Sequence, residues 1–225
     1  MPLLLQDVVF ADGPAIANIH TSAFFDDPFQ QALFPNMSFE KQLAGMNDRW
    51  PSDFGDSSLF WKKVVDTESG EIAGYSKWAF GFTDAGGVRE GRGEIADIPD
   101  DVELKISSTS EGRDDAFAED FAKKVTEVRN RVLGERPQLQ LKGLAVLPSH
   151  QRRGVGTLQL AWATELADEK GLTCWIQGSP AAVALYKKFG FKVEGEIVSM
   201  CRDMDGVKAP HVSTLMMRLQ KTEEL

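Results

Sequence analysis

The chain has 225 residues, of which 42% are apolar and 26% charged, values typical of a soluble globular protein that buries a core without disulfides or metals. Its two cysteines, Cys174 and Cys201, lie outside any CxxC or Cys/His cluster, so neither a disulfide framework nor a zinc site is predicted. The formal net charge of −9 argues against nucleic-acid binding, which needs a basic face. The sequence shows no signal-peptide pattern and no apolar run of membrane-spanning length, so we predict a cytoplasmic protein without a membrane partner.

The first part of the chain predicts strands and helices in alternation. Asp12 is the expected N-cap of the first helix and Pro14 lies in its first turn, where both residue types are favoured. A turn-prone segment follows at 25–28. The turn-rich segment 66–70 separates two strands and predicts an antiparallel hairpin. The predicted elements here are a strand over 3–10, helices beginning after Asp12 and over 39–50, and strands over 57–65 and 71–82.

Residues 83–109 differ from their surroundings because they are rich in glycine and acidic residues and poor in large apolar ones. Between Thr83 and Asp120 twelve acids stand against four bases, which gives this stretch a charge of −8 (four minus twelve). Such a composition predicts a long solvated loop. A helix is expected from Asp114 to Gly134, since apolar residues recur there every three or four positions. We therefore predict a single domain over 1–225, with an acidic loop plus helix insertion at about 83–136.

The remaining residues carry the clearest pattern. Pro148 ends a strand over 139–147, and a loop with Gly154 and Gly156 leads into a helix that ends at Gly171. Glycine and proline at these positions are typical of helix and strand boundaries. The other predicted elements are a buried strand over 172–176, a short helix over 180–189, and strands over 191–200 and 212–219.

The loop 151–156 has the composition of an anion site. A strand, a short glycine loop and a helix present several backbone N–H groups at the positive end of the helix dipole, which suits a phosphate or pyrophosphate. The pattern is not a Walker A loop, because Gly156 is followed by Thr157 and Leu158, and not a dinucleotide fingerprint, because position 159 is Gln159. A helix start that uses glycine only for packing is the alternative, and the spacing alone leaves both open.

Two segments resemble motifs of the GCN5-related N-acetyltransferase (GNAT) superfamily, in the order and at the distance expected. Residues 144–156, Leu-Ala-Val-Leu-Pro-Ser-His-Gln-Arg-Arg-Gly-Val-Gly, resemble its Gln/Arg-x-x-Gly-x-Gly/Ala motif, which follows a strand ending in Val-x-Pro. Residues 182–191, Ala-Val-Ala-Leu-Tyr-Lys-Lys-Phe-Gly-Phe, resemble its Ala-x-x-Leu-Tyr-x-x-x-Gly-Phe motif. The resemblance implies an α/β (α+β) fold, with a mixed, largely antiparallel central sheet, a splayed parallel strand pair and helices on both faces.

The resemblance also implies an acetyl-coenzyme A site between the splayed strands, here 139–147 and 172–177, and no metal. The pantetheine arm is extended and rich in amides, so it can pair with a strand edge. The expected cofactor-binding residues are Leu144, Ala145 and Val146 for the pantetheine, and Gln151, Arg152, Arg153, Gly154, Val155, Gly156 and Thr157 for the pyrophosphate.

The chemistry that the resemblance implies is direct attack of a neutral amine on the thioester, with positioning supplying much of the rate. A strand N–H near Leu144 or Ala145 would polarise the thioester carbonyl. Tyr186 matches the tyrosine that protonates the departing thiolate, and a phenol is a suitable acid for this step. The alternative for Tyr186 is a helix tyrosine that packs over the sheet.

The sequence does not identify the base that takes the acceptor's proton. Many members of the superfamily carry a carboxylate on the strand corresponding to 172–177, which has none here, and Ser179 stands where many have Asn. His150 is expected to face solvent beside the glycine loop. Phe24, Phe25 and Phe29 either line the acceptor pocket or pack in the core. The other candidates for the base, none of them assigned a catalytic role, are Asp26, Asp27, Glu40, His20 and a relayed water.

The sequence thus predicts an acetyl-coenzyme A-dependent N-acetyltransferase that acts on a primary amine of a small molecule, with a hydroxyl acceptor less favoured. Two alternatives stay open: a module that binds acyl-coenzyme A without transferring the acyl group, and a protein or peptide N-acetyltransferase. The acceptor, the length of the acyl chain and the choice between monomer and homodimer are left open.

Overall fold

The computed structural model describes residues 2–56, 58–81, 98–99, 112–134, 136, 138–202 and 208–220. The acidic loop predicted over 83–109 lies outside the described residues, except for 98–99. In chain order the elements are β1 (Leu3–Asp7), the 3-10 turn η1 (Phe10–Asp12), α1 (Gly13–Phe24), α2 (Pro28–Leu33), α3 (Phe39–Gly55), β2 (Leu59–Asp66), β3 (Ile72–Gly81), α4 (Asp115–Leu133), β4 (Gln138–Val146), the 3-10 turn η2 (Pro148–His150), α5 (Val155–Lys170), β5 (Thr173–Gly178), α6 (Val183–Lys188), β6 (Lys192–Arg202) and β7 (Lys208–Arg218).

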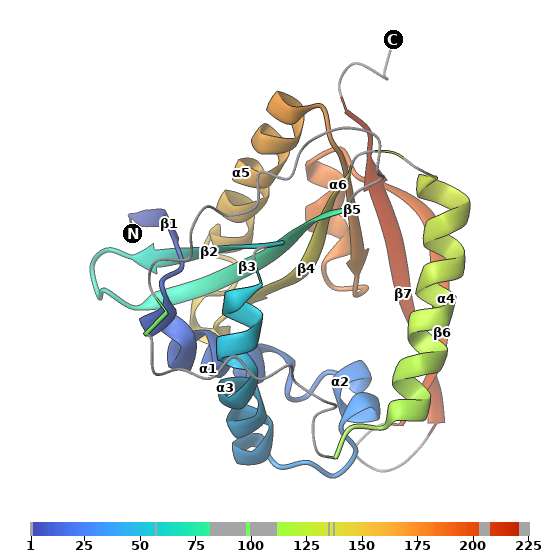
Figure 1. Ribbon diagram of the computed structural model, residues 1–225, viewed down its shortest axis with the longest axis horizontal. Helices are drawn as coiled ribbons and strands as arrows, with labels where there is room; N and C mark the ends of the chain where they lie inside the picture. The colour runs from blue at the N-terminus through green and yellow to red at the C-terminus, as the bar shows by residue number, and fades with distance from the viewer. Residues whose placement is uncertain are drawn as a thin grey trace.

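Seven strands form one sheet in the order β1-β2-β3-β4-β5-β7-β6. Neighbouring strands are antiparallel throughout, except that β4 and β5 are parallel. Helices lie on both faces of the sheet (Figure 1). The side chains of α5 and α6 pack on one face, here called the α5 face, and those of α1, α3 and α4 pack on the other, the α1 face. The predicted mixed α/β fold class is confirmed.

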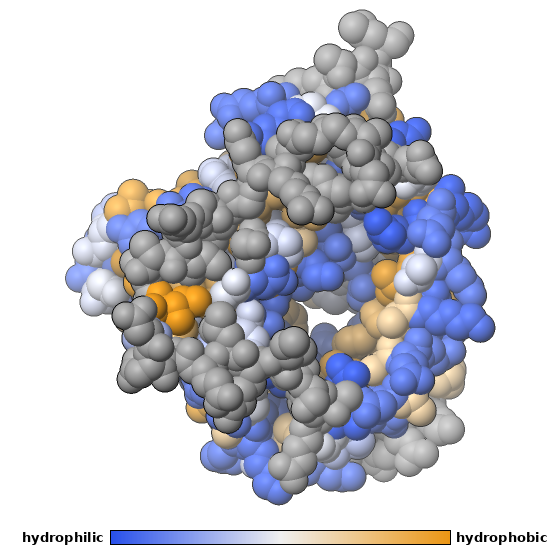
Figure 2. Space-filling model, viewed as in Figure 1, coloured by the Kyte–Doolittle hydropathy of each residue, from blue (hydrophilic) through white to orange (hydrophobic). Residues whose placement is uncertain are grey.

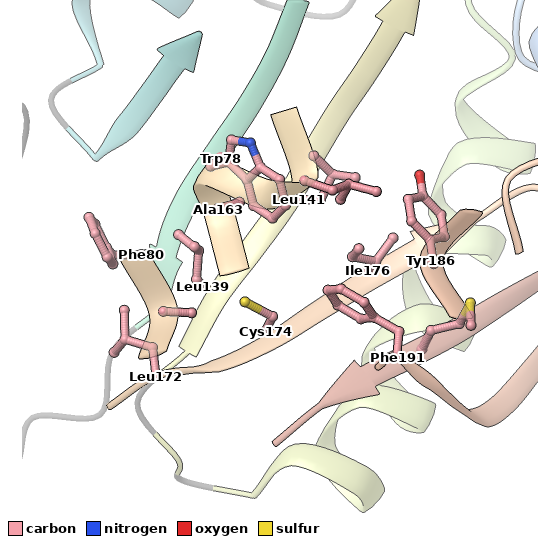
Figure 3. Close-up of a cluster of buried hydrophobic side chains, with 13 residues drawn as sticks. Trp78, Phe80, Leu139, Leu141, Ala163, Leu172, Cys174, Ile176, Tyr186 and Phe191 are labelled. Atoms are coloured by element: carbon pink, nitrogen blue, oxygen red, sulfur yellow. The ribbon is translucent and has the colours of Figure 1, made fainter. Parts of the chain in front are cut away.

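Each face of the sheet carries its own apolar core. On the α5 face, Trp78 and Ile176 pack with Ala163 of α5 in the cluster drawn in Figure 3. On the α1 face, Phe54 of α3 is fully buried against Trp61 of β2. The central strands of the sheet are therefore packed on both faces, which holds them in place.

Helix α4 covers the far end of the sheet, across β7 and β6 (Figure 1). Its apolar stripe, which includes Val125 and Val128, packs on Trp175 and Leu215. Helix and sheet approach closely because position 195 is glycine: a Cβ there would lie 2.6 Å from Cγ1 of Val128. The helix predicted from Asp114 is therefore present, and it packs closely on the sheet.

The structure corrects the predicted boundaries at several points. Residues 28–33, which follow the predicted turn-prone segment and for which no element is predicted, form helix α2, with Asp27 as its N-cap. Helix α3 continues through Pro51 to Gly55 instead of ending at Trp50. Continuation buries both Trp50 and Phe54, which offsets the cost of about 3 kcal/mol for proline inside a helix. Helix α6 is shorter than predicted, and β7 begins four residues earlier, at 208 instead of 212.

Candidate active site

The parallel pair β4–β5 is joined at only one of its ends. Pairing runs from Gln138 with Thr173 to Leu141 with Ile176 and then stops, although the strands continue to Val146 and Gly178. Beyond Leu141, β4 is paired with β3 on its other edge. The edge of β4 that faces β5 therefore has no strand partner over 142–146 within the described structure, and its backbone groups can pair with an extended ligand.

A β-bulge at Lys142 accounts for this separation. On β3, Lys77 pairs with Gly143 and Trp78 pairs with Leu141, so Lys142 is an extra residue without a partner. A bulge bends the strand and increases its local twist, and here it stands at the position where β4 leaves β5. The bulge also changes which face each residue takes: Leu141 packs on the α5 face, whereas Ala145 packs on the α1 face.

The loop that follows β4 leaves the N-terminus of α5 without a side-chain cap. Its N-cap is Gly154, with φ of +94°, and this residue supplies no side-chain cap to the N–H groups of the first turn. Arg152 also takes a positive φ, of +63°. Residues 151–154 are exposed, and a Cβ on Gly154 would meet nothing within 4 Å. The free N–H groups of this turn therefore face open space, as an anion site requires.

The long side chains of this loop are turned toward its own backbone. Nε2 of Gln151 donates to the carbonyl of Val146 at 3.4 Å, and Nη1 of Arg153 donates to the carbonyl of Ser149 at 3.3 Å. Gly156 has a packing role as well, because a Cβ there would lie 3.1 Å from Cδ2 of Leu185. The side chains brace the loop, and its exposed backbone is what a ligand would meet.

Tyr186 lies on α6 and packs over β5, next to the separated strand ends. Its ring occupies the space that a side chain at position 178 would fill: a Cβ on Gly178 would lie 2.7 Å from Cε2 of Tyr186. Figure 3 shows the hydroxyl at the margin of the apolar cluster, pointing away from Phe191 and Ile176. Burial raises the pKa of the Tyr186 hydroxyl above its usual value, so the group is protonated at neutral pH. It can therefore donate a proton from this position.

On the α1 face, a second polar group lies beside the bulge. Nδ1 of His20 and the hydroxyl of Tyr75 are 2.7 Å apart. A Cβ on Gly143 would lie 3.8 Å from that hydroxyl, so the pair adjoins β4 where it leaves β5. Burial, with smaller effects from Arg49 and Lys77, lowers the pKa of His20 from 6.5 to about 4. The imidazole is therefore neutral at pH 7, and one of its ring nitrogens accepts a hydrogen bond.

Of the side chains considered as bases, the structure brings only His20 beside the strand separation. Asp27 caps α2, accepting from the N–H groups of Phe29 and Gln30. Glu40 lies in the first turn of α3 and Asp26 is exposed. Tyr75, which joins His20 to β4, is not among the residues that the sequence motifs single out. Lys142 and Gly143 interrupt a mostly apolar strand, but the sequence alone does not connect them with Tyr75 or His20.

His150 is buried, and the expectation that it faces solvent is wrong. The turn η2 directs its ring under the β2–β3 hairpin, where Nε2 lies 3.5 Å from Oδ2 of Asp66 and 3.7 Å from Oε2 of Glu71. Its Nδ1 lies 2.9 Å from the hydroxyl oxygen of Ser149. A carboxylate and a hydroxyl supply the polar partners that a buried imidazole needs. His150 therefore anchors the chain ahead of the glycine loop.

The three phenylalanines near the first helix have different surroundings. Phe24 packs against His20, with ring centroids 4.9 Å apart, and Phe25 packs against Phe39 at 5.5 Å. Phe29 of α2 lies 4.4 Å from Phe121 of α4. Figure 2 shows the surface hollowed between α4 on one side and α2 and α3 on the other. The contact between Phe29 and Phe121 joins α2 to α4, two of the helices that border this hollow.

Metal and membrane sites are both missing from the part of the chain that the structure describes. No three histidine, cysteine or carboxylate side chains gather there in a way that could hold a metal ion. No helix there combines the length and the apolar character needed to cross a lipid bilayer.

Comparison with known proteins finds similarity to acetyltransferases. The sequence profile of the acetyltransferase (GNAT) family matches residues 118–191. No curated protein sequence matches the chain significantly.

Many solved structures share the fold. One is described as histone acetyltransferase HPA2 and related acetyltransferase from Corynebacterium glutamicum, with a TM-score of 0.59 and 18% identity over 98% of this chain and 97% of that one. Another is a GNAT superfamily phosphinothricin acetyltransferase from Sinorhizobium meliloti in complex with AcCoA, with a TM-score of 0.54 and 15% identity over 98% and 90% of the two chains. NAA60 from Arabidopsis thaliana in complex with a bisubstrate analogue gives a TM-score of 0.54 and 12% identity over 98% and 99%. At these identities the likeness is one of fold.

Proposed function

We propose that this chain is a member of the acetyltransferase (GNAT) family and that it transfers the acetyl group of acetyl-coenzyme A to a primary amine of a small molecule. The profile of that family matches residues 118–191, and solved acetyltransferases share the fold. The observation that carries the proposal is the separation of β4 from β5 beside the uncapped N-terminus of α5. Acyl transfer from acetyl-coenzyme A is the activity of this family. The chain acts as one domain over 1–225, in which the acidic loop plus helix at about 83–136 is an insertion.

The coenzyme is held mainly by backbone groups in this proposal. Leu144, Ala145 and Val146 offer the open edge of β4 to the pantetheine amides, as an added strand would use it. The residues that surround the pyrophosphate are those of the exposed turn and the start of the helix, namely Gln151, Arg152, Arg153, Gly154, Val155, Gly156 and Thr157. The absence of a capping side chain supports this role, because the N–H groups of the first turn need an acceptor.

Transfer then proceeds by one bond exchange. The amine nitrogen bonds to the acyl carbon, the carbon–sulfur bond breaks, and the thioester becomes an amide and a free thiol. A backbone N–H of β4 at Leu144 or Ala145 stabilises the negative charge that develops on the carbonyl oxygen. Tyr186 gives its phenolic proton to the departing sulfur and regains one from the proton that the amine releases. Burial of Tyr186 keeps that proton in place until it is needed.

His20 and Tyr75 act on the amine side of the reaction in this proposal. A neutral His20 accepts the hydrogen bond of the Tyr75 hydroxyl through Nδ1. The Tyr75 oxygen then directs its lone pairs away from His20 and can accept an N–H of the incoming amine. The pair thus orients a neutral amine beside Gly143, and the nitrogen lone pair is left free for attack.

Release of free thiol from acetyl-coenzyme A, measured against a broad panel of amines, hydroxyl compounds and peptides, tests this function. We expect release with at least one class of small primary amine, and mass spectrometry should show an N-acetyl product. The control is the same assay without acceptor, in which thiol release should be slow.

Other outcomes identify the alternatives. Acetylation of peptides but not of free amines would replace the small-molecule assignment with a peptide acetyltransferase. Calorimetric binding of acetyl-coenzyme A without transfer to any acceptor would identify a binding module that lacks transferase activity.

A further inference from the structure

Three cations lie across the α1 face of the sheet where β4 and β5 separate, and we call Lys77, Arg129 and Lys142 the cationic cluster. Lys77 stands opposite Gly143, next to the bulge residue Lys142. The guanidinium carbon of Arg129, on α4, lies 5.8 Å from the ring centroid of Trp175. Trp175 pairs across the sheet with Gln140, two residues before Lys142. Lys77 of β3, Lys142 of β4 and Arg129, which lies over Trp175 of β5, thus belong to three adjacent positions across the sheet.

Among the residues that the structure describes, acidic partners neutralise the positive charge of this cluster only in part. Nζ of Lys77 lies 2.9 Å from Oδ2 of Asp53 and 4.8 Å from the Trp61 ring centroid, so this lysine has a partner. Lys142 forms no hydrogen bond or ion pair with any residue that the structure describes. The negative charge of Asp56 acts to raise the pKa of Lys142, and Oδ1 of Asp56 accepts from the backbone N–H and the hydroxyl of Ser58.

The arginine is likewise short of acidic partners. Nη1 of Arg129 reaches only the amide oxygen of Asn130, at 3.5 Å, among the described residues. The pKa of Lys142 is lowered by burial first and then by repulsion from Lys77 and Arg129. The cations thus oppose one another in a chain whose net charge is −9. An anion that entered this space would relieve the repulsion.

The position of the cluster relates it to the proposed chemistry. Lys142 precedes Leu144 and Ala145 by two and three residues, which corresponds to roughly 7–10 Å along an extended strand. These are the residues whose backbone is proposed to hold the thioester, and Gly143 adjoins the Tyr75 hydroxyl. An amine at the thioester and an anionic group at Lys142 can therefore belong to one small molecule.

We infer that the acceptor is an amino acid or a similar small amino-carboxylate, whose carboxylate is bound by Lys142 and Arg129 while its amine faces β4. This inference rests on the proposed acetyltransferase function and specifies its substrate class. Lysine and arginine both form charge-assisted hydrogen bonds with carboxylates, and arginine can form two at once. Lys77, already paired with Asp53, adds to the positive potential at the site.

Matched acceptor pairs test the inference in the thiol-release assay. Glycine, L-leucine, L-phenylalanine and L-glutamate are each compared with the corresponding carboxamide, which keeps the amine and removes the α-carboxylate charge. O-phosphoethanolamine is compared with ethanolamine, so that a phosphate preference is distinguished from a carboxylate preference. We expect kcat/KM at least about tenfold higher for one or more amino acids than for their amides, the range that hydrogen bonds to charged groups give. Equal values within every amino acid pair, or a preference for phosphate alone, would overturn the carboxylate assignment.

Variants of Lys142 separate charge from other roles of the side chain. Lys142→Met should lower kcat/KM for the preferred amino acid by about 10- to 100-fold and leave that for its amide within about twofold. Lys142→Arg should retain most of the activity, because it retains the charge. Lys123→Met, which removes an exposed lysine on the same helix as Arg129, is the matched control and should leave both acceptors unaffected. Equal losses for acid and amide, or an Arg variant as impaired as the Met variant, would contradict carboxylate binding by Lys142.

Calorimetry distinguishes failure of the inference from failure of the proposed function. The protein saturated with acetyl-coenzyme A is titrated with L-phenylalanine and with L-phenylalaninamide, in wild type and in Lys142→Met. Binding of the acid that is lost in the variant, without any thiol release, would uphold the anion site and overturn the transferase assignment. Acetylation of amides and acids alike would uphold the transferase and overturn the anion site.

Discussion

The Tyr75 hydroxyl lies 2.7 Å from Nδ1 of His20, and this contact ties helix α1 to the strand that pairs with the open segment of β4. Aromatic rings pack against both side chains, with Phe24 on His20 and Trp61 on Tyr75. Burial lowers the pKa of His20 to about 4 and raises that of Tyr75 above its usual value. Both side chains are therefore uncharged at neutral pH. The hydrogen bond between them satisfies two polar groups in a buried place.

His20 should make the protein less stable in mild acid. Its pKa is about 4 in the folded protein against 6.5 for the free side chain. Between these values the unfolded chain binds a proton that the folded chain does not, so stability rises with pH across this window and falls as pH drops from 6.5 to 4. The loss attributable to His20 is up to roughly 3 kcal/mol. Urea unfolding from pH 4.5 to 7 should show a smaller pH dependence for His20→Gln than for wild type, and identical dependences would refute the assignment.

Tyr186→Phe should reduce turnover without loosening the fold. The hydroxyl forms no hydrogen bond with the described residues, whereas the ring packs on Gly178. We expect kcat to fall by about 100-fold, with the dissociation constant of acetyl-coenzyme A and the melting temperature nearly unchanged. Tyr186→Ala should instead destabilise the protein by about 3–5 kcal/mol. If Tyr186→Phe already lowers the melting temperature and coenzyme affinity, the residue is structural.

Two glycines near the site should respond differently to the same substitution. A Cβ on Gly74 of β3 would lie 2.6 Å from the carbonyl oxygen of Ala145 and 2.8 Å from Cγ1 of Val155, so backbone would have to move. Gly74→Ala should cost about 2–3 kcal/mol. Gly143→Ala, whose nearest contact is the Tyr75 hydroxyl at 3.8 Å, should leave the unfolding free energy within about 1 kcal/mol. Denaturant titration of the two variants side by side checks the contrast, and equal losses would argue against the close approach at Gly74.

The effects of substituting Arg218 of β7 and Asp168 of α5 on the free energy of unfolding should be strongly coupled, because the two side chains form an ion pair. Nη1–Oδ1 and Nη2–Oδ2 are both 2.8 Å, and the two side chains are 13% and 17% exposed. Arg218→Met removes the guanidinium from a poorly solvated carboxylate, and should destabilise the protein by about 2–4 kcal/mol. Adding Asp168→Leu should recover part of that loss. A double-mutant cycle measures the coupling, and strictly additive losses would show that the pair contributes little.

The part of the fold that the sequence predicts best is the part in which glycine and proline mark the boundaries. Pro148, Gly171 and Gly190 delimit β4, α5 and α6 closely, because these residues restrict or extend the backbone angles in known ways. The sequence does not predict helix α2, since Asp27-Pro28 suits a turn and a helix start equally well. In the folded protein Phe29 of α2 packs on Phe121 of α4 and on His211 of β7, and these contacts are not visible in the local sequence.

The bulge in β4 could not be predicted because the sequence pattern conceals it. Leu139, Leu141, Ala145 and Leu147 alternate with other residues, as one buried face of a regular strand would. In the structure the first two pack on the α5 face and the last two on the α1 face. Both faces are apolar, so the alternation fits either arrangement. Lys142, the extra residue at this change of face, is therefore not singled out by the sequence alone.

Gly178 affects how the proposed catalytic role of Tyr186 can be tested. The Tyr186 ring is seated in a space that exists because the facing strand carries no side chain there. Truncation scans would overlook this position, since glycine has nothing to truncate, and an alanine at 178 is an enlargement. A methyl group added at this position of β5 would lie 2.7 Å from Cε2 of Tyr186, so the ring would have to shift while the phenol itself is retained. Gly178→Ala thus offers a way to vary the reach of the hydroxyl separately from its chemistry.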